Sequence, residues 1–288
     1  AMLFGVLIVF QGKIVYVPYV PGRDYDWTPE MFRMGHENVW LRSRDGTKLH
    51  AWLIFKGDRP DKTLPTVLFF QENAGNISHR LPYMQLIQHH MPCNALMLSY
   101  RGYGQSEGTP SEAGIKADAQ AALDHLLQRR DIDRTKLVLF GRSLGGAVAI
   151  HLASKNVDAV RALMLENTFT SIPDMAGAMF PALAPIVSFP PVHVLITNKW
   201  RNIKAVEELG NLPVLMLSSG QDEMVPAEQM HKLRGAVSSP NVTWVEFPHG
   251  RHMVRFRIRI GYRVLAAGTC TCLQGGQVVP TPTPNVAR

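Results

Sequence analysis

The chain has 288 residues, of which 46% are hydrophobic and 18% are charged, a composition that suits one large folded domain and excludes a disordered chain. Its formal net charge of +7 lies at one end, because residues 251–288 carry six arginines and no acid, while the remaining residues carry 24 bases and 23 acids. The charge therefore does not indicate a nucleic-acid-binding surface. Three cysteines are too few for a disulfide scaffold, and no second Cys or His pair lies near Cys270 and Cys272 at zinc-ligand spacing, so we expect no metal.

An apolar run, Met2–Phe10, opens the sequence. It is well short of the roughly 20 residues that span a bilayer, and we expect residues 1–20 to be an apolar segment at the end of a truncated membrane anchor. Lys13, Tyr16 and Tyr19 suit its interfacial flank. A signal-peptide remnant or an apolar first strand would explain the same run. We therefore expect membrane association through the N-terminus, in a compartment that the sequence does not identify.

Strand patterns begin at Val39, where two alternating segments flank the turn signal Asp45-Gly46 and continue to Phe55. Beyond the proline-rich residues 60–65, a series of short apolar runs has the length expected of strands buried on both faces. These runs are Thr66–Phe70, Ala95–Leu98, Leu137–Phe140, Ala162–Leu165, Val214–Leu217 and Val242–Glu246.

Helical patterns alternate with these strands, most clearly at residues 111–128, where apolar residues recur at helical spacing. The alternation predicts an α/β fold with a mostly parallel central sheet, helices on both faces and right-handed crossovers. We assign residues 36–253 to this domain. The proline-rich residues 169–202 interrupt the alternation and are expected to form a small helical lid, although an ordinary irregular connection with a buried helix fits as well.

A serine motif, Gly141-Arg-Ser-Leu-Gly-Gly146, directly follows the Leu137–Phe140 strand and precedes the helix-compatible run Ala147–Ala153. A serine on such a tight strand-to-helix turn is held in a strained conformation that only small flanking residues permit. The helix N-terminus beside it favours a developing negative charge. Ser143 is therefore the candidate nucleophile.

Serine is a weak nucleophile, so it needs a base within hydrogen-bonding reach and a third group that orients the base. Asp222 follows the Val214–Leu217 strand and His252 follows the Val242–Glu246 strand, in the chain order Ser, Asp, His that this fold uses. Other candidates remain open at this point. They are the carboxylates Glu166 and Glu223 and the imidazole of His249.

An oxyanion hole is expected from the N–H of Leu144 and one N–H of the loop Gln71–Asn76, for which Asn73 is the preferred residue. Asn and Gly clusters are also ordinary turn formers, so this loop could simply connect a strand to a helix.

Several stretches together resemble the bud-emergence-type group of α/β-hydrolase domain proteins, especially its plant wavy-growth members. The matching stretches are Phe70-Gln-Glu-Asn-Ala-Gly-Asn76, Leu98-Ser-Tyr-Arg-Gly-Tyr-Gly104, Asp118-Ala-Gln-Ala-Ala-Leu-Asp124, Phe140-Gly-Arg-Ser-Leu-Gly-Gly146, Leu165-Glu-Asn-Thr-Phe-Thr-Ser171 and Gln221-Asp-Glu-Met-Val-Pro226. The resemblance covers roughly residues 11–253. It implies a membrane-anchored serine hydrolase that uses Ser143, Asp222 and His252.

Two departures from this group stand out. Gln71-Glu72 replaces the His-Gly of many relatives, which affects the shape of the oxyanion loop. Residues 254–288 form a basic and then Gly-, Thr- and Pro-rich tail where the group continues into a closing helix. The tail resembles the product of a shifted reading frame or a retained intron, or else it is a basic tail that touches anionic lipid.

The resulting hypothesis is a serine esterase or thioesterase that needs no cofactor and acts on a small-molecule or lipid acyl substrate, or on an S-acylated protein. The lipid and protein substrates are suggested by analogy with related hydrolases. The alternative is a catalytically impaired, membrane-tethered interaction protein whose altered C-terminus leaves the pocket inactive.

Overall fold

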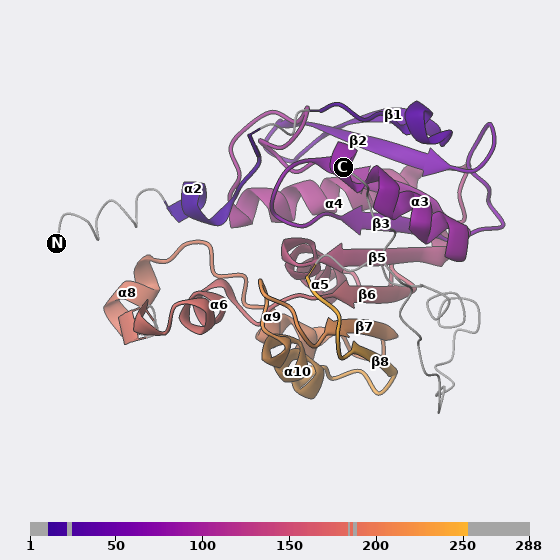
Figure 1. The fold of residues 1–288 in the computed structure, drawn as a ribbon. Helices are drawn as coiled ribbons and strands as arrows, with labels where there is room; N and C mark the ends of the chain where they lie inside the picture. The colour runs from indigo at the N-terminus through magenta and orange to yellow at the C-terminus, as the bar shows by residue number, and fades with distance from the viewer. Residues whose placement is uncertain (1–10, 22–24, 184, 187–188, 253–288) are drawn as a thin grey trace, which may run out of the picture.

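A computed structural model describes residues 11–21, 25–183, 185–186 and 189–252 (Figure 1). Within these ranges, eight strands form one sheet in the order β1-β2-β4-β3-β5-β6-β7-β8. The strands are β1 (Gly35–Arg42), β2 (Lys48–Phe55), β3 (Thr66–Phe70), β4 (Asn94–Leu98), β5 (Leu137–Arg142), β6 (Ala162–Glu166), β7 (Val214–Ser219) and β8 (Val242–Phe247). β1 and β4 pair antiparallel with β2, and every other pairing is parallel. The predicted mostly parallel sheet is confirmed.

The antiparallel hairpin differs from its predicted pattern in two respects. β1 begins at Gly35, four residues before the expected Val39, because the ladder continues until Gly35 lies opposite Phe55. β2 was expected to alternate, yet all of its residues except Lys48 are buried. The cause is its position between β1 and β4, where both of its faces are covered by apolar side chains.

Helices and short 3₁₀ helices occupy the connections. The α-helices are α2 (Gln11–Val15), α3 (Leu81–His90), α4 (Glu112–Gln128), α5 (Leu144–Lys155), α6 (Ile172–Met179), α8 (Pro190–Leu195), α9 (Asn202–Ala205) and α10 (Ala227–Ala236). The 3₁₀ helices are η1 (Pro29–Phe32), η2 (Ile77–Arg80), η3 (Arg134–Lys136), η4 (Pro181–Leu183) and η5 (Val206–Glu208). Ser111 caps α4 by accepting a hydrogen bond from the Gly114 N–H, as expected at a helix start.

Two apolar clusters pack against the sheet, one on each face. Along β3, Leu68 and Phe70 belong to the cluster that contains the buried side chains of α4 and α5. Val67 and Phe69 belong to the second cluster, together with α3. Since successive side chains of a strand point to opposite faces, a strand covered on both faces must be apolar throughout. The continuous apolar runs of the sequence therefore reflect a sheet between two layers of helices.

Residues 169–202, the predicted insertion, contain α6, η4 and α8, which lie with α2 beyond one edge of the sheet (Figure 1). Their role as a lid stays a prediction. Residues 1–10 and the tail 254–288 lie outside the described residues, so the expectations for them are not addressed by the structure. Within the described ranges, no helix has the length and apolar character that crossing a membrane requires.

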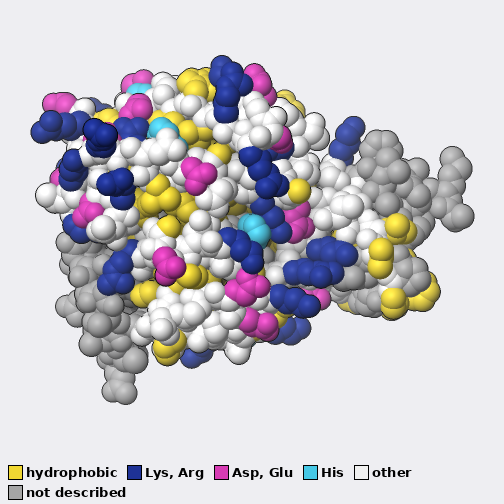
Figure 2. Space-filling model, turned by 180° about the vertical axis from the view of Figure 1, so that it is seen from behind, with side chains coloured by type: hydrophobic (Ala, Val, Ile, Leu, Met, Phe, Trp, Pro, Cys, Tyr) yellow, Lys and Arg dark blue, Asp and Glu magenta, His cyan; other side chains and the backbone are white. Residues whose placement is uncertain are grey.

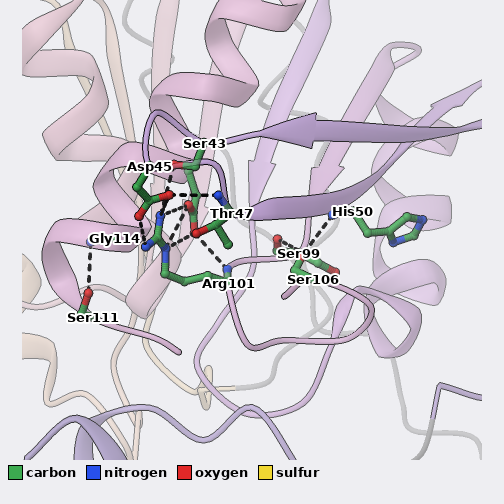
Figure 3. A network of polar contacts seen from close by, with 10 residues as sticks. Ser43, Asp45, Thr47, His50, Ser99, Arg101, Ser106, Ser111 and Gly114 are labelled. Atoms are coloured by element: carbon green, nitrogen blue, oxygen red, sulfur yellow. Dashed lines mark hydrogen bonds and ion pairs between the residues drawn. The ribbon is translucent and has the colours of Figure 1, made fainter. Parts of the chain in front are cut away.

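A buried arginine connects the hairpin, the loop after β4 and helix α4 (Figure 3). The Arg101 guanidinium donates to Asp118 Oδ1 at 2.7 Å, to Asp45 Oδ2 at 2.7 Å and to Ser43 Oγ at 3.1 Å. The Arg101 side chain also crosses Gly114, where an added Cβ would lie 2.5 Å from its Cδ. Three segments that are distant in the chain are thus held by one cation.

The Asp118→Ala variant should lose about 3 kcal/mol of unfolding free energy, because the buried Arg101 guanidinium loses its buried partner and keeps only the exposed Asp45. The side chain of Asp118 is 0% exposed, whereas that of Asp45 is 48% exposed. Asp45→Ala is the matched control and should cost clearly less, since solvent screens an exposed pair. Urea unfolding measures both, and equal losses would contradict the central position of Asp118.

Candidate active site

The serine motif forms a sharp bend between β5 and α5. β5 ends at Arg142, α5 begins at Leu144, and Ser143 between them has φ 51° and ψ −118°. Positive φ is a strained conformation for a residue with a side chain. The Ser143 N–H donates to the Glu166 carbonyl at 2.9 Å, which ties the bend to the end of β6.

Two glycines make the bend possible, because the backbones approach each other too closely for a side chain. A Cβ on Gly141 would lie 2.0 Å from the Gly145 carbonyl oxygen, and a Cβ on Gly145 would lie 1.9 Å from the Phe70 carbonyl oxygen. Contacts under 3.0 Å with backbone atoms cannot be relieved by a side-chain rotation. The start of helix α5 therefore packs backbone to backbone against the ends of β3 and β5.

Asp222 and His252 meet at the carboxyl ends of β7 and β8. Asp222 Oδ2 lies 2.7 Å from His252 Nδ1, and its Oδ1 accepts the N–H groups of Met224 and Val225 at 2.8 and 2.7 Å. These backbone donors orient the carboxylate, and the carboxylate in turn orients the imidazole. When His252 Nδ1 carries the proton, its Nε2 can act as a proton acceptor.

The other candidates occupy different positions. Glu166 is buried beside Arg142 and Tyr83, and Glu223 accepts the backbone N–H of His252 at 3.4 Å rather than its ring. His249 Nδ1 lies 3.4 Å from Gln221 Nε2 at the surface. Among the acids and histidines that the sequence left open, the structure therefore pairs Asp222 with His252.

Ser143 follows β5 and His252 follows β8, with β6 and β7 between them in the sheet, and no hydrogen bond joins the two residues in the described part of the chain. Both are buried, at 8% and 6% exposure. The side chains of Arg142 and Asn167 both donate to the His252 carbonyl, so the histidine loop is fastened to the ends of β5 and β6. Catalytic hydrogen bonds are often long before substrate binds.

A cluster of buried charges surrounds this junction. Glu72 pairs with Arg80 at 2.9 Å, and Arg142 pairs with Glu166 at 3.4 Å, while Tyr83 donates to Glu166. Burial raises the pKa of Glu166 despite the nearby Arg142. Burial acts to raise the pKa of Glu72, but the guanidinium groups of Arg80 and Arg142 have the larger combined effect, so the pKa of this carboxyl lies below its usual value.

Sequence reasoning did not identify this cluster as functional. Arg142 lies inside the serine motif and Glu72 lies in the part of the oxyanion loop that departs from many relatives, so the sequence drew attention to both positions. Arg80 and Tyr83 carried none, because they stand in the η2 and α3 region, and only folding brings them beside the strand ends.

The two predicted oxyanion donors lie in the loop after β3 and at the start of α5. Leu144 is the first residue of α5, where an N–H has no acceptor inside the helix. The Asn73 side chain donates to the Val15 carbonyl at 2.6 Å and accepts from the Val17 N–H and the Tyr103 hydroxyl. This side chain therefore fixes the N-terminal segment to the loop, which the sequence did not indicate.

No group of three or more His, Cys, Asp or Glu side chains that could hold a metal ion occurs among the residues described by the structure. The acids and histidines of the site are instead engaged with one another and with arginines.

Comparison with known proteins identifies similar sequences over most of the chain. A family model described as alpha/beta hydrolase fold matches residues 84–188. The alpha/beta hydrolase domain-containing protein WAV2 of Arabidopsis thaliana is 50% identical over 257 residues, which cover 86% of this chain and 82% of that protein. Protein bem46 of Schizosaccharomyces pombe is 41% identical, with coverage of 86% and 82%. The uncharacterized membrane protein YNL320W of Saccharomyces cerevisiae is 36% identical, with coverage of 84% and 83%.

Among solved structures, an esterase of Pyrococcus furiosus, Pf2001, is similar with a TM-score of 0.64. The match covers 88% of this chain and 95% of the esterase at 19% sequence identity. At that identity the likeness is one of fold.

The Gly145→Ala variant should lose at least about 3 kcal/mol of unfolding free energy, because its Cβ would overlap the Phe70 carbonyl and force the helix off the sheet. Gly235 provides the matched control, since it lies in α10 with nothing within 4 Å of an added Cβ. Gly235→Ala should gain about 0.5–1 kcal/mol from the helix propensity of alanine. If urea unfolding shows similar stabilities for the two variants, the close approach at Gly145 is wrong.

Proposed function

The chain belongs to the α/β-hydrolase family, and from this premise we propose that it is a serine hydrolase that cleaves acyl esters or thioesters. One observation carries the proposal. A serine in a strained bend follows β5, and an Asp–His hydrogen-bonded pair follows β7 and β8, so all three residues stand at the carboxyl ends of strands within the run β5-β6-β7-β8 of one sheet.

In the proposed mechanism, Ser143 Oγ attacks the acyl carbonyl while His252 removes its proton. Asp222 holds the Nδ1 side of the ring and stabilises the imidazolium that forms. His252 then returns the proton to the leaving alcohol or thiol, and the acyl group stays on Ser143 as an ester. Water next attacks this ester while His252 removes a proton from the water. The carboxylic acid leaves, and His252 returns the proton to Ser143 Oγ. Residues that hold the His252 carbonyl, chiefly Arg142, limit the movement of the ring between these two tasks.

The oxyanion that forms during both steps would lie between the N–H groups of Leu144 and Asn73. The start of α5 supports this assignment, because the helix dipole favours negative charge there. The hydrogen bonds of the Asn73 side chain to Val15 and Val17 fix the loop that carries the second donor. A preorganised donor stabilises the charge without a reorganisation cost at the moment of reaction.

An acyl substrate with an apolar chain is the proposed class, either a lipid ester or an S-acylated protein. Its support is the apolar character of the insertion beyond the sheet edge, where Phe180, Phe189 and Val194 are more than half exposed. A membrane-tethered interaction protein without catalytic activity is the alternative that the following experiment separates.

Wild-type protein should react with a fluorophosphonate probe and hydrolyse para-nitrophenyl esters, and Ser143→Ala should do neither, because it lacks the nucleophile. Asp222→Asn should lower kcat about 10³- to 10⁴-fold, since the amide favours the wrong ring tautomer and does not stabilise the imidazolium. Gel fluorescence and absorbance assays provide the measurements, with short and long acyl chains compared.

Two matched controls accompany these variants. Ser154→Ala removes a hydroxyl from the same helix α5, and His249→Ala removes the neighbouring imidazole; both should retain labelling and turnover. Equal labelling of Ser143→Ala and wild type would exclude Ser143 as the nucleophile. A folded wild-type protein with neither labelling nor turnover would favour the interaction protein.

We also propose that the protein is membrane-associated through its N-terminal segment. The support is the apolar run Met2–Phe10 and the similarity to a yeast protein named as a membrane protein. The double variant Leu7→Lys with Ile8→Lys should lower the fraction that sediments with membranes, because each charge raises the cost of entering hydrocarbon. Asn211→Lys with Gln128→Lys adds the same charge at exposed positions and should sediment like wild type. Equal sedimentation of both variants would contradict an N-terminal anchor.

A further inference from the structure

Exposed large hydrophobic side chains gather at one end of the molecule. Ile14, Val17 and Tyr19, in and after α2, are 58%, 39% and 62% exposed. Phe180, Phe189 and Val194, in the insertion, are 57%, 57% and 74% exposed. These six side chains are called the apolar platform below. Exposed apolar side chains that gather at one end of a protein indicate a site of contact with a partner or a membrane.

Hydrogen bonds join the α2 segment to the insertion and the residues that follow it, although the two are more than 150 residues apart in the chain. Gln11 Nε2 donates to the Leu195 carbonyl at 3.2 Å, and Gln11 Oε1 accepts the Thr197 N–H at 2.7 Å. The buried Tyr16 hydroxyl donates to Asn198 Oδ1 and accepts the Trp200 indole N–H at 3.0 Å. Figure 1 shows α2 and α8 at the same end of the molecule. The two segments that carry the exposed side chains are therefore held together at this end of the molecule.

None of these six side chains belongs to the two buried apolar clusters. In the α2 segment, Val15 and Tyr16 already face inward and pack against the main apolar cluster, while Ile14 and Val17 face outward. In α6, Met175 packs against the same cluster, and Phe180 beyond its end is exposed. Each segment thus has a buried face and a second apolar face that the folded chain leaves in water.

Positive charge accompanies the apolar platform. Lys13 in α2 and Arg201 and Lys204 after α8 are exposed, while Asp174 is the only acidic residue between 169 and 204. Figure 2 shows Lys and Arg side chains beside the projecting lobe that carries the hydrophobic ones. Apolar side chains rimmed by cations match the interface of a bilayer with anionic headgroups, where the apolar groups enter and the cations stay at the headgroups.

The chain direction also favours a bilayer over a protein partner. The apolar run Met2–Phe10 joins α2 directly at Gln11, so the most hydrophobic sequence of the chain begins at the apolar platform. The strands β3 and β5 end on this side of the sheet (Figure 1), and Ser143 directly follows β5.

We propose that the apolar platform is a membrane-docking surface that inserts Phe180, Phe189 and Val194 into the headgroup region of an anionic bilayer. The insertion thereby provides a second contact with the membrane besides the N-terminal segment. It places the candidate active-site edge of the sheet toward the lipid. This proposal does not require Ser143 to be catalytic, and its test measures no hydrolysis.

The test places an environment-sensitive fluorophore at Val194 through a Val194→Cys variant. Cys270 and Cys272 are replaced by Ser, whereas Cys93 is buried and stays. Vesicles of phosphatidylcholine with 30% phosphatidylserine should shift the emission to the blue, and bromolipids brominated near the headgroup should quench it. Met31→Cys is the matched control, because Met31 is 64% exposed in η1, outside the apolar platform, and should show neither effect.

Binding of unlabelled protein to the same vesicles provides the second measurement. Phe189→Ser with Val194→Ser should weaken binding by about tenfold or more, as expected from the loss of buried apolar surface. Met31→Ser with Trp40→Ser removes comparable exposed groups elsewhere and should leave binding unchanged. Circular dichroism checks that both variants are folded.

Three results would overturn the proposal. The first is bound protein whose Val194 probe stays in water, which would assign all binding to the N-terminal segment. The second is the absence of vesicle binding, which would leave the apolar platform to a protein or to a second copy of the chain. The third is equal binding to vesicles without phosphatidylserine, which would contradict the role of the cationic rim.

Discussion

The arrangement of the site depends on the close approach of helix α5 to the ends of β3 and β5. Gly141 and Gly145 allow backbone to lie against backbone, and no side chain larger than hydrogen fits at either position. The strain of Ser143 at positive φ is sustained because the strand before it and the helix after it are both fixed in the core. The packing of β5 and α5 therefore holds Ser143 at the carboxyl ends of the strands.

The same edge contains an unusual amount of buried charge. Glu72, Arg80, Arg142 and Glu166 are all at most 6% exposed. Charges taken out of water are costly unless each has a partner, and here the pairs Glu72–Arg80 and Arg142–Glu166 meet that requirement. Because Arg142 also binds the His252 carbonyl, the charge cluster is mechanically part of the site rather than a separate stabilising element.

The end of the molecule beyond this edge has a different character. Its segments, α2 and the insertion, have inward faces that pack on the domain and outward faces that remain apolar. The proposed active site lies at the same end of the molecule, which agrees with the proposal of a substrate with an apolar acyl chain. A single orientation of the domain at a membrane would therefore suit both the proposed hydrolysis and the proposed docking.

The parallel strands and the serine bend could be located from local sequence. Continuous apolar runs located β3 to β8 to within two residues, because a strand covered on both faces must be apolar throughout, and glycines around Ser143 located the turn. The sequence favoured Asp222 over Glu166 and Glu223, and His252 over His249, but spacing along the chain did not exclude the others, since all of them follow strands. The folded chain brings Asp222 to His252. It also shows two contacts that the sequence did not indicate: Asn73 holds the N-terminal segment, and Arg80 and Tyr83 join the charge cluster. Such pairings depend on which strand ends become neighbours across the sheet, and residue spacing along the chain does not specify that arrangement.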